Sequence, residues 1–142
     1  MLNLRAIKVR DYMARSIITF RTDTSVLQAI KILIDNGISG APVVDNLGNL
    51  IGMLSEKDCM KVALDSSYHE VGGAGNVGDY MYPKVETVDA DASILDIAER
   101  FLKEPFRRFP VTFEDRLVGQ ISRRDVLRAL DRMWDKSSSS AA

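Results

Sequence analysis

The spacing of apolar residues between positions 17 and 64 changes several times and predicts short elements of alternating type. Residues 17–20 are β-branched or aromatic and predict a short strand. After Ser25, apolar side chains recur at intervals of three and four residues and predict an amphipathic helix, with Ser25 and Gln28 forming its N-terminal cap. Gly37 can adopt the left-handed conformation that ends such a helix.

Two further apolar runs predict a β-hairpin. They occupy residues 42–44 and 50–54 and flank the polar stretch 45–49. Ser55 and Asp58 then have the spacing of a helix start, and we expect this second helix to run to about Leu64. The predicted order of elements is strand, helix, strand, strand, helix.

The same order returns later in the chain, because residues 9–13 are repeated at 77–81. The correspondence continues to the second helix, where Ser55 and Asp58 of the first copy match Ser122 and Asp125 of the second, with one residue fewer in the hairpin turn. A lone unit of roughly 60 residues would bury little of its surface. We therefore expect the two copies to pack together and to build the functional site jointly.

The second copy departs from the first in two places. Glu104-Pro105 stands where the first copy has the glycine that ends its helix. Proline cannot continue a helix, so this pair is expected to end the corresponding helix of the second copy. Residues 106–109, Phe-Arg-Arg-Phe, replace 38–41, Ile-Ser-Gly-Ala. The last helix is expected to run from Ser122 to about Trp134.

Composition and charge exclude several functions. The 142 residues carry 19 basic and 20 acidic side chains, which argues against a nucleic-acid surface because such surfaces have a basic excess. No apolar run approaches the roughly 18 residues of a membrane span. The N-terminus lacks the apolar core of a secretory signal. Cys59 is the only cysteine, so no intrachain disulfide can form, and we expect a cytoplasmic protein.

No motif in the chain indicates catalysis. The single cysteine has no histidine beside it, His69 has no second candidate metal ligand nearby, and no glycine-rich phosphate loop is present. We therefore expect no enzyme activity, no catalytic residues and no metal site.

The duplicated motifs resemble a known family. Asp-Tyr-Met, a strand ending in Thr, a capped helix, Gly-Ile-x-x-x-Pro-Val-Val-Asp, Leu-Ile-Gly-x-Leu and Ser-x-x-Asp follow in the order of a CBS motif. Two copies in tandem resemble a Bateman module, over about residues 7–134. The resemblance implies an α/β (α+β) fold in which two β-α-β-β-α motifs, related by a pseudo-twofold axis, pack into one module. The expected boundaries are 7–66 and 77–134 for the motifs, 67–76 for a flexible linker and 135–142 for a disordered tail.

The resemblance also implies a function. Such modules bind adenosine-containing ligands (AMP, ADP, ATP or a relative) in clefts between the motifs and regulate a partner, which here would be a separate protein. The adenine ligand is regulatory, no catalytic cofactor is expected, and Mg²⁺ would enter only with ATP. A homodimer of modules is implied, with neither nucleic acid nor membrane as a partner.

Two sites follow from the resemblance, with the apolar members around adenine and Asp58 and Asp125 on the ribose hydroxyls. Site A comprises Ile18, Thr19, Ile38, Ser39, Ala41, Pro42, Ser55, Lys57 and Asp58. Site B comprises Val85, Thr87, Arg107, Arg108, Phe109, Pro110, Ser122, Arg124 and Asp125. Free amides at a helix start donate hydrogen bonds to a phosphate, and a carboxylate there accepts hydrogen bonds from a diol. Gly52 and Gly119 are expected to let a ligand approach the backbone.

The same residues also have a purely structural interpretation. Ser-x-x-Asp is a capping box, and Ser93 and Asp96 have this spacing outside either site. The apolar members of both sites can equally be core residues. The alternative function is therefore a dimerisation or interaction scaffold that binds no small molecule.

The two sites are not expected to be equal. Site B is surrounded by arginines, at positions 107, 108, 123 and 124, where the first copy has Ser39, Gly40, Glu56 and Lys57. Arginine binds phosphate through two parallel hydrogen bonds and stays charged. We predict that site B holds the more phosphorylated ligand or binds the common ligand more tightly, with a solvated basic patch as the alternative.

Overall fold

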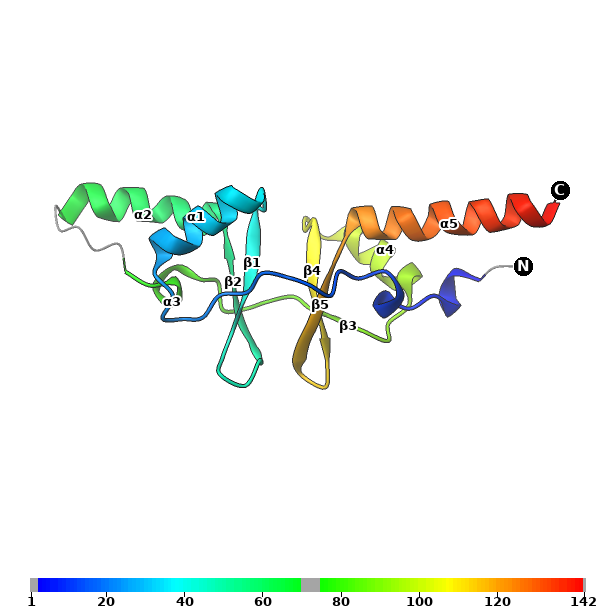
Figure 1. Ribbon diagram of the computed structural model, residues 1–142, viewed down its shortest axis with the longest axis horizontal. Helices are drawn as coiled ribbons and strands as arrows, with labels where there is room; N and C mark the ends of the chain where they lie inside the picture. The colour runs from blue at the N-terminus through cyan, green and yellow to red at the C-terminus, as the bar shows by residue number, and fades with distance from the viewer. Residues whose placement is uncertain (1–2, 70–74, 142) are drawn as a thin grey trace. The chain divides into compact units, whose positions relative to one another are not determined.

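The computed structural model describes residues 3–69 and 75–141. Twelve elements follow one another in this part of the chain (Figure 1). In order they are η1 (Leu4–Ala6), η2 (Val9–Asp11), α1 (Val26–Asn36), β1 (Gly40–Val44), β2 (Leu50–Ser55), α2 (Glu56–His69), α3 (Val77–Tyr80), β3 (Val88–Asp89), α4 (Ile94–Lys103), β4 (Arg108–Phe113), β5 (Arg116–Ser122) and α5 (Arg123–Ala141).

The chain divides into two compact units. Residues Ile18–Val85 form one, which we call the central unit, and the segments before and after it form the other, the terminal unit. The central unit has a two-stranded antiparallel sheet, β1–β2, and the terminal unit has a three-stranded sheet in the order β3-β4-β5, with β3 parallel to β4.

The first helix of each copy begins and ends as its sequence predicts. In α1 the Ser25 hydroxyl accepts from the Gln28 amide, and Gly37 closes the helix in the left-handed region at φ +62°. In α4, Ser93 caps the start, and the helix ends at Lys103, before the Glu104-Pro105 pair. The apolar face of each helix packs into the core of its own unit.

Both predicted hairpins form, and their turns explain the missing residue. In the first, Asp45 accepts from the amides of Leu47 and Asn49 across a longer loop. In the second, Glu114 and Asp115 both have positive φ, at 52° and 66°, which gives a two-residue turn of the type that suits twisted strands. Each hairpin has a register irregularity at the equivalent place, after Val43 and after Val111.

The predicted first strand is wrong for most of its length. Of residues 17–20, only Phe20 pairs, through a single parallel bridge to Val43. The Phe20 amide donates to Pro42 O, and the Val44 amide donates to Phe20 O, before a turn closed by Thr24 redirects the chain. The counterpart in the second copy, β3, is a strand of two residues. β-branched composition favours extended backbone, but this turn leaves no room for a longer ladder.

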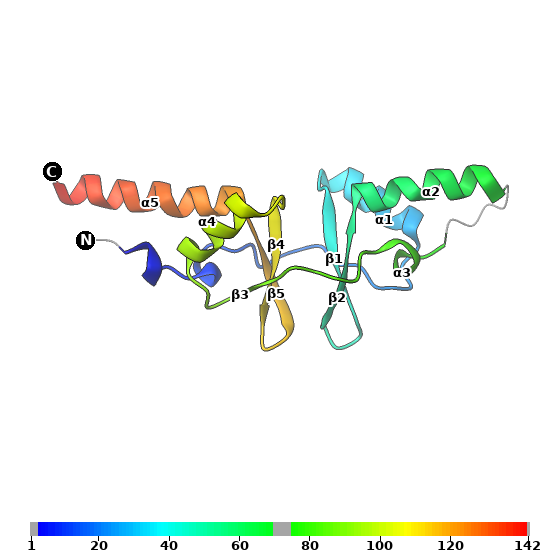
Figure 2. The ribbon, with the colours of Figure 1, turned by 180° about the vertical axis from the view of Figure 1, so that it is seen from behind.

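Each compact unit contains a piece of the other repeat. Val9, in the first repeat, is fully buried in the core of the terminal unit, where its amide donates to Ala92 O at 2.9 Å. Val77, in the second repeat, is fully buried in the core of the central unit, where its amide donates to Thr24 O at 2.8 Å. The short helices η1 and η2 lie with α4 in Figures 1 and 2, and α3 lies with α1 and α2. The compact units therefore differ from the sequence repeats.

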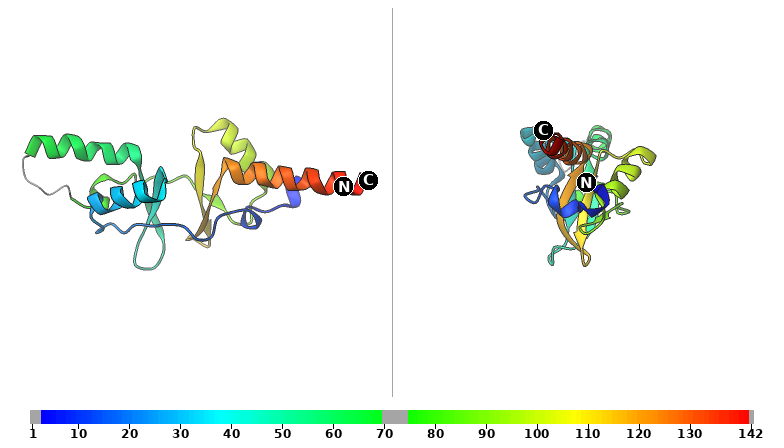
Figure 3. Two further views of the ribbon diagram at one scale, coloured as in Figure 1. Left: turned by 45° about the horizontal axis from the view of Figure 1, so that its top comes forward. Right: turned by 90° about the vertical axis from the view of Figure 1, so that its right-hand side faces the viewer.

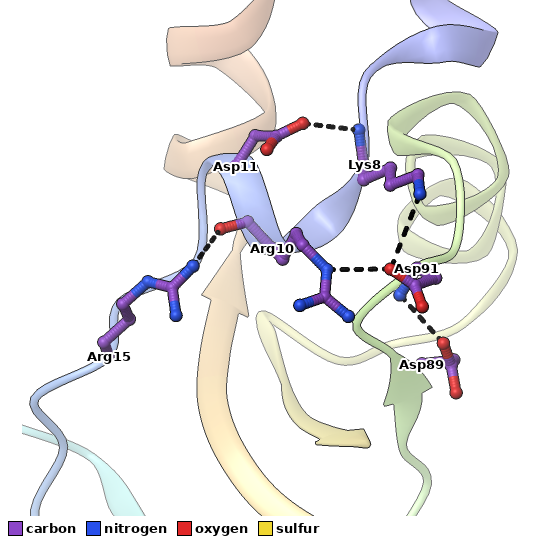
Figure 4. Close-up of polar contacts among 6 residues, drawn as sticks. All are labelled: Lys8, Arg10, Asp11, Arg15, Asp89 and Asp91. Carbon is purple, nitrogen blue, oxygen red and sulfur yellow. Dashed lines mark hydrogen bonds and ion pairs between the residues drawn. The ribbon is translucent and has the colours of Figure 1, made fainter. Parts of the chain in front are cut away.

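Charged side chains fasten this exchanged segment in the terminal unit (Figure 4). Arg10 Nε lies 2.7 Å from Asp91 Oδ1, Lys8 Nζ lies 3.7 Å from the same oxygen, and the Arg10 guanidinium lies over the ring of Phe113. The hydrogen bond and charge of Arg10 hold the pKa of Asp91 below its ordinary value of 3.8.

The segments between and after the repeats differ from expectation. Helix α2 continues to His69, and helix α5 continues without interruption to Ala141 (Figure 3), through residues that we expected to be a disordered tail. Adding residues to an existing helix is far easier than starting one, so a serine-rich stretch can extend it. Of the predicted linker, residues 70–74 lie outside the described part of the chain. Gly75 has φ +86°, and Asn76 caps α3.

Candidate ligand-binding sites

Ser55 and Asp58 form a reciprocal hydrogen-bonded turn at the start of α2. Asp58 Oδ2 accepts from the Ser55 amide at 3.0 Å and from the Ser55 hydroxyl at 2.9 Å, and the Ser55 hydroxyl oxygen accepts from the Asp58 amide at 3.2 Å. Ser122 and Asp125 repeat this turn at the start of α5, with distances of 2.9, 3.1 and 3.3 Å. The structural interpretation of Ser-x-x-Asp as a capping box is therefore correct for both pairs.

The second oxygen of each carboxylate is held less firmly. Asp58 Oδ1 lies 3.6 Å from Lys61 Nζ, and Asp125 Oδ1 lies 3.0 Å from Arg128 Nη1. Both carboxylates are 14% exposed, whereas both bases are 62% exposed and sit one turn further along the helix. Because the basic side chain of each pair lies largely in solvent, the ion pair contributes little to stability. An incoming hydroxyl group can therefore replace the base at Oδ1 while Oδ2 keeps the helix capped.

Lys61 and Arg128 were missed from the sequence, although a signal for them was present. They occupy corresponding positions in the two repeats, each three residues after the aspartate. In a helix this spacing brings the two side chains together.

Strand pairing brings the two segments of each site side by side. In site A, Gly40 pairs with Ser55, and the Glu56 amide donates to Ser39 O at 2.9 Å. In site B, Arg108 pairs with Ser122, and the Arg123 amide donates to Arg107 O at 3.2 Å. In each unit the helix start and the segment before the first hairpin strand therefore form one continuous surface.

The remaining predicted site residues differ in how closely the structure places them to the rest of their site. Ile18 and Thr19 directly precede Phe20, whose amide donates to the oxygen of Pro42, another predicted member of site A. Thr87 directly precedes β3, which pairs with β4, and its carbonyl oxygen accepts from Arg100 Nη1. Val85 is the last residue of the central unit, whereas the rest of site B belongs to the terminal unit.

Several predicted apolar contacts are core residues. Ala41, Pro42, Phe109 and Pro110 are buried, and Phe109 packs against Phe101 with ring centroids 4.8 Å apart. The Arg100 guanidinium lies 4.4 Å from the centre of the Phe109 ring. Ile18, Ile38 and Thr87 are half-buried, and the polar members Ser39, Lys57, Arg107 and Arg124 are exposed. The accessible surface of each site is thus more polar than its sequence suggested.

Gly52 and Gly119 have a role other than the one predicted. A Cβ at Gly119 would lie 2.6 Å from Ala14 O, and one at Gly52 would lie 2.6 Å from Met81 Sδ. The absent side chains make room for the exchanged segments of the protein itself, which pair there through Ala14 with Gln120 and through Tyr82 with Met53. The expectation that these glycines admit a ligand is therefore replaced by a packing role.

The third Ser-x-x-Asp sequence folds differently. The Ser93 hydroxyl oxygen accepts from the Leu95 amide at 3.1 Å, and Asp96 is exposed. The reciprocal turn thus forms at the two predicted site positions and does not follow from the Ser-x-x-Asp sequence alone.

Cys59 directly follows Asp58 and is half-buried. Burial raises the pKa of its thiol, and the neighbouring carboxylates of Asp58 and Glu56 raise it further. The thiol is therefore held in its unreactive, protonated form.

Comparison with known proteins identifies the family. A model of the CBS domain matches the chain twice, over residues 9–65 and 77–132. The chain therefore belongs to the CBS domain family and carries two tandem copies, a CBS pair. In the described part of the chain no helix is both long enough and apolar enough to cross a membrane.

The chain is also similar to longer proteins. It is 30% identical to MJ1225 of Methanocaldococcus jannaschii over 127 residues and 33% identical to MJ0188 of the same organism over 129 residues. These matches cover 89% and 87% of the chain but 44% of each relative. The match to CBSX1 of Arabidopsis thaliana, at 29% identity, covers 75% of the chain and 56% of that protein. The chain thus spans about half the length of these relatives.

Solved structures of CBS pairs share the fold. The crystal structure of CBSX2 in complex with AMP aligns with a TM-score of 0.77 at 27% identity, covering 89% of this chain and 97% of that one. The CBS pair of MJ0100 in complex with 5′-methylthioadenosine and S-adenosyl-L-methionine aligns with a TM-score of 0.71 at 26% identity, covering 87% and 99%.

Proposed function

We propose that this CBS pair is a non-catalytic regulatory module that binds adenosine-containing ligands at sites A and B and acts on a separate partner protein. The ligand is AMP, ADP, ATP or a relative such as S-adenosylmethionine. With a single cysteine and no disulfide to form, the module suits the reducing cytosol.

The observation that carries the proposal is the pair of matching helix starts. Asp58 and Asp125 each use one oxygen for the cap and present the other to a displaceable base. The two ribose hydroxyls can donate to such an oxygen. The adjacent segments 38–42 and 107–110 supply apolar residues beside the adenine ring and polar residues beside a phosphate.

The comparisons support the class of ligand. CBSX2 and MJ0100 have been crystallised with AMP, 5′-methylthioadenosine and S-adenosyl-L-methionine, all of which contain adenosine. A ligand regulates only when its affinity differs between two conformations of the protein. Signalling by this module therefore requires that the partner distinguish a liganded from an unliganded form.

Calorimetric titration of AMP, ADP, ATP and S-adenosylmethionine tests the proposal. Asp58→Ala and Asp125→Ala should each weaken binding at one site by roughly 10–150-fold, the equivalent of about 1.5–3 kcal/mol for hydrogen bonds to a charged group. Asp96→Ala is the matched control, because Asp96 has the same sequence context but lies outside both sites.

The capping role of the aspartates requires a second control. Ser122→Ala removes the hydroxyl that bonds Asp125 but leaves the carboxylate, so its loss of stability measures the contribution of the cap apart from the aspartate itself. Unchanged affinity in both aspartate variants would refute the site assignment.

The alternative function is an interaction scaffold that binds no small ligand. Exposed apolar side chains on α2 and α5 support an interaction surface. Met60 and Leu64 on α2 are 67% and 70% exposed, and Leu127 and Trp134 on α5 are 63% and 72% exposed. Such surfaces mark interaction sites, and we propose that they join two modules in a homodimer. Sedimentation at micromolar concentration should show a dimer that Trp134→Glu dissociates.

Thermal unfolding separates the two functions. A ligand at 100 times its dissociation constant adds about 2.7 kcal/mol of stability, which raises Tm by several degrees. A dimer whose Tm responds to none of the four compounds would favour the scaffold.

A further inference from the structure

We propose that the two sites select ligands of different charge, with Arg108 as the residue that decides the difference. The site in the terminal unit binds the phosphate of an adenine nucleotide through Arg108, and the site in the central unit binds the adenosine moiety without a phosphate contact at that position. This inference rests on the proposed function and specifies the ligand class of each site.

Arg108 has one buried nitrogen, a hydrogen-bond donor that the described residues leave unsatisfied. Its Nε is buried and has no hydrogen-bond partner in the part of the chain that the structure describes, and the residue as a whole is half-buried. A buried N–H that makes no hydrogen bond costs stability, and an acceptor atom of a bound ligand would recover that cost.

Arg108 lies beside the Ser122–Asp125 turn of the proposed site. It is the first residue of β4 and pairs directly with Ser122, the residue that caps α5 and holds Asp125. Because side chains alternate along a strand, Arg108 lies on the face opposite Phe109, which is in the core. Two oxygens of a phosphate group can accept parallel N–H hydrogen bonds from the planar guanidinium.

The central unit cannot contain an equivalent group. Gly40 occupies the matching position, at the start of β1 and opposite Ser55. A Cβ there would lie 2.9 Å from the backbone oxygen of Leu54, which is held within β2. No side chain fits at this position without moving the strand, so the difference between the sites is built into the backbone.

The surrounding charges follow the same division. Arg107, Arg123 and Arg124 border the terminal-unit site and are exposed. Their counterparts in the central unit are Ser39, Glu56 and Lys57, whose formal charges cancel. Glu56 is the first residue of α2, where its charge opposes the approach of an anion to the free amides.

The test measures adenosine and AMP by calorimetry, one site at a time. Asp58→Ala leaves the terminal-unit site, and in this background AMP should bind at least 10-fold more tightly than adenosine. Adding Arg108→Gln should weaken AMP by roughly 10–150-fold and change adenosine by less than about threefold. Asp125→Ala leaves the central-unit site, where the two compounds should bind within about threefold of each other.

The control is Arg132→Gln, which removes an equal charge from an exposed position on α5. It should leave AMP binding within about threefold. Without ligand, Arg108→Gln should unfold at the same temperature as the parent or a higher one, because the buried Nε–H of Arg108 has no hydrogen bond to lose.

Each contrary result has a separate meaning. If neither compound binds the parent protein, this inference fails, and the proposed function fails with it when ADP, ATP and S-adenosylmethionine do not bind either. If both bind but Asp58→Ala shows no preference for AMP, the inference alone is refuted. It is equally refuted if Arg108→Gln weakens adenosine as much as AMP, if it lowers Tm without ligand, or if Arg132→Gln has the same effect on AMP.

Discussion

Gly119 and Ala14 are in direct backbone contact, although they belong to different repeats. A Cβ at Gly119 would lie 2.6 Å from the carbonyl oxygen of Ala14, and that carbonyl accepts from the Gln120 amide at 3.0 Å. In the terminal unit this contact packs the exchanged segment against β5. In the central unit the equivalent contact of Gly52 with Met81 and Tyr82 packs the exchanged segment against β2.

Replacing Gly119 by alanine should therefore destabilise the protein by about 1–3 kcal/mol, as expected for added volume in a packed site. Gly52→Ala is the matched variant and should cost less, because its closest neighbour is the end of the flexible Met81 side chain and not a backbone atom. Urea unfolding of both variants measures the difference. Equal decreases in the free energy of unfolding would show that the backbone contact with Ala14 is no more restrictive than the side-chain contact with Met81.

Val9→Ala should loosen the terminal unit even though Val9 lies in the first repeat. The side chain is fully buried there, and its truncation should cost about 2 kcal/mol. Native-state hydrogen exchange should show reduced protection in β4 and β5 with little change in β1 and β2. Val77→Ala should give the reverse pattern, and loss of protection in the mutated residue's own repeat would contradict the exchange of segments.

Ser122→Ala should lower stability by about 1 kcal/mol, because the hydroxyl no longer accepts from the Asp125 amide or donates to Asp125 Oδ2. Ser55→Ala should have a similar effect in the central unit. Thermal unfolding without ligand provides the measurement. A neutral effect in both variants would mean that water replaces the hydroxyl at no cost.

Arg10→Gln should raise the pKa of Asp91 toward 3.8, because the hydrogen bond and charge of Arg10 are the main cause of its lowering. A carboxyl whose pKa is depressed by folding adds stability above its unfolded-state pKa and loses it as the pH falls through the folded-state pKa. The stability difference between parent and variant should therefore be present at neutral pH and disappear below 3.8. NMR titration of Asp91 checks the shift directly. A control, Arg15→Gln, removes a charge that does not bond to Asp91 and should leave its pKa in place.

Local signals in the sequence predicted most of the elements and the Ser-x-x-Asp turn at the start of α2 and of α5. Ser25 and Gly37 mark the ends of α1, Pro105 follows the end of α4, and the spacing of Ser122 and Asp125 predicts their turn, because caps and turns depend on neighbouring residues. The strand at 17–20 could not be predicted correctly, because its length depends on the pairing of Phe20 with Val43 and on the turn that follows.

By itself, then, the sequence determined the duplication, the CBS family and the two helix starts that carry Asp58 and Asp125, since each can be recognised from the order of residues without knowing which segments meet in space. Only the tertiary structure decided that Val9 completes the unit of the second repeat and that Gly119 makes room for Ala14. It alone also decided that Phe109 is core while the buried Nε of Arg108 finds no hydrogen-bond partner among the described residues. Burial and hydrogen-bond satisfaction at these positions depend on segments far apart in the chain, and no local pattern records which of those segments will meet.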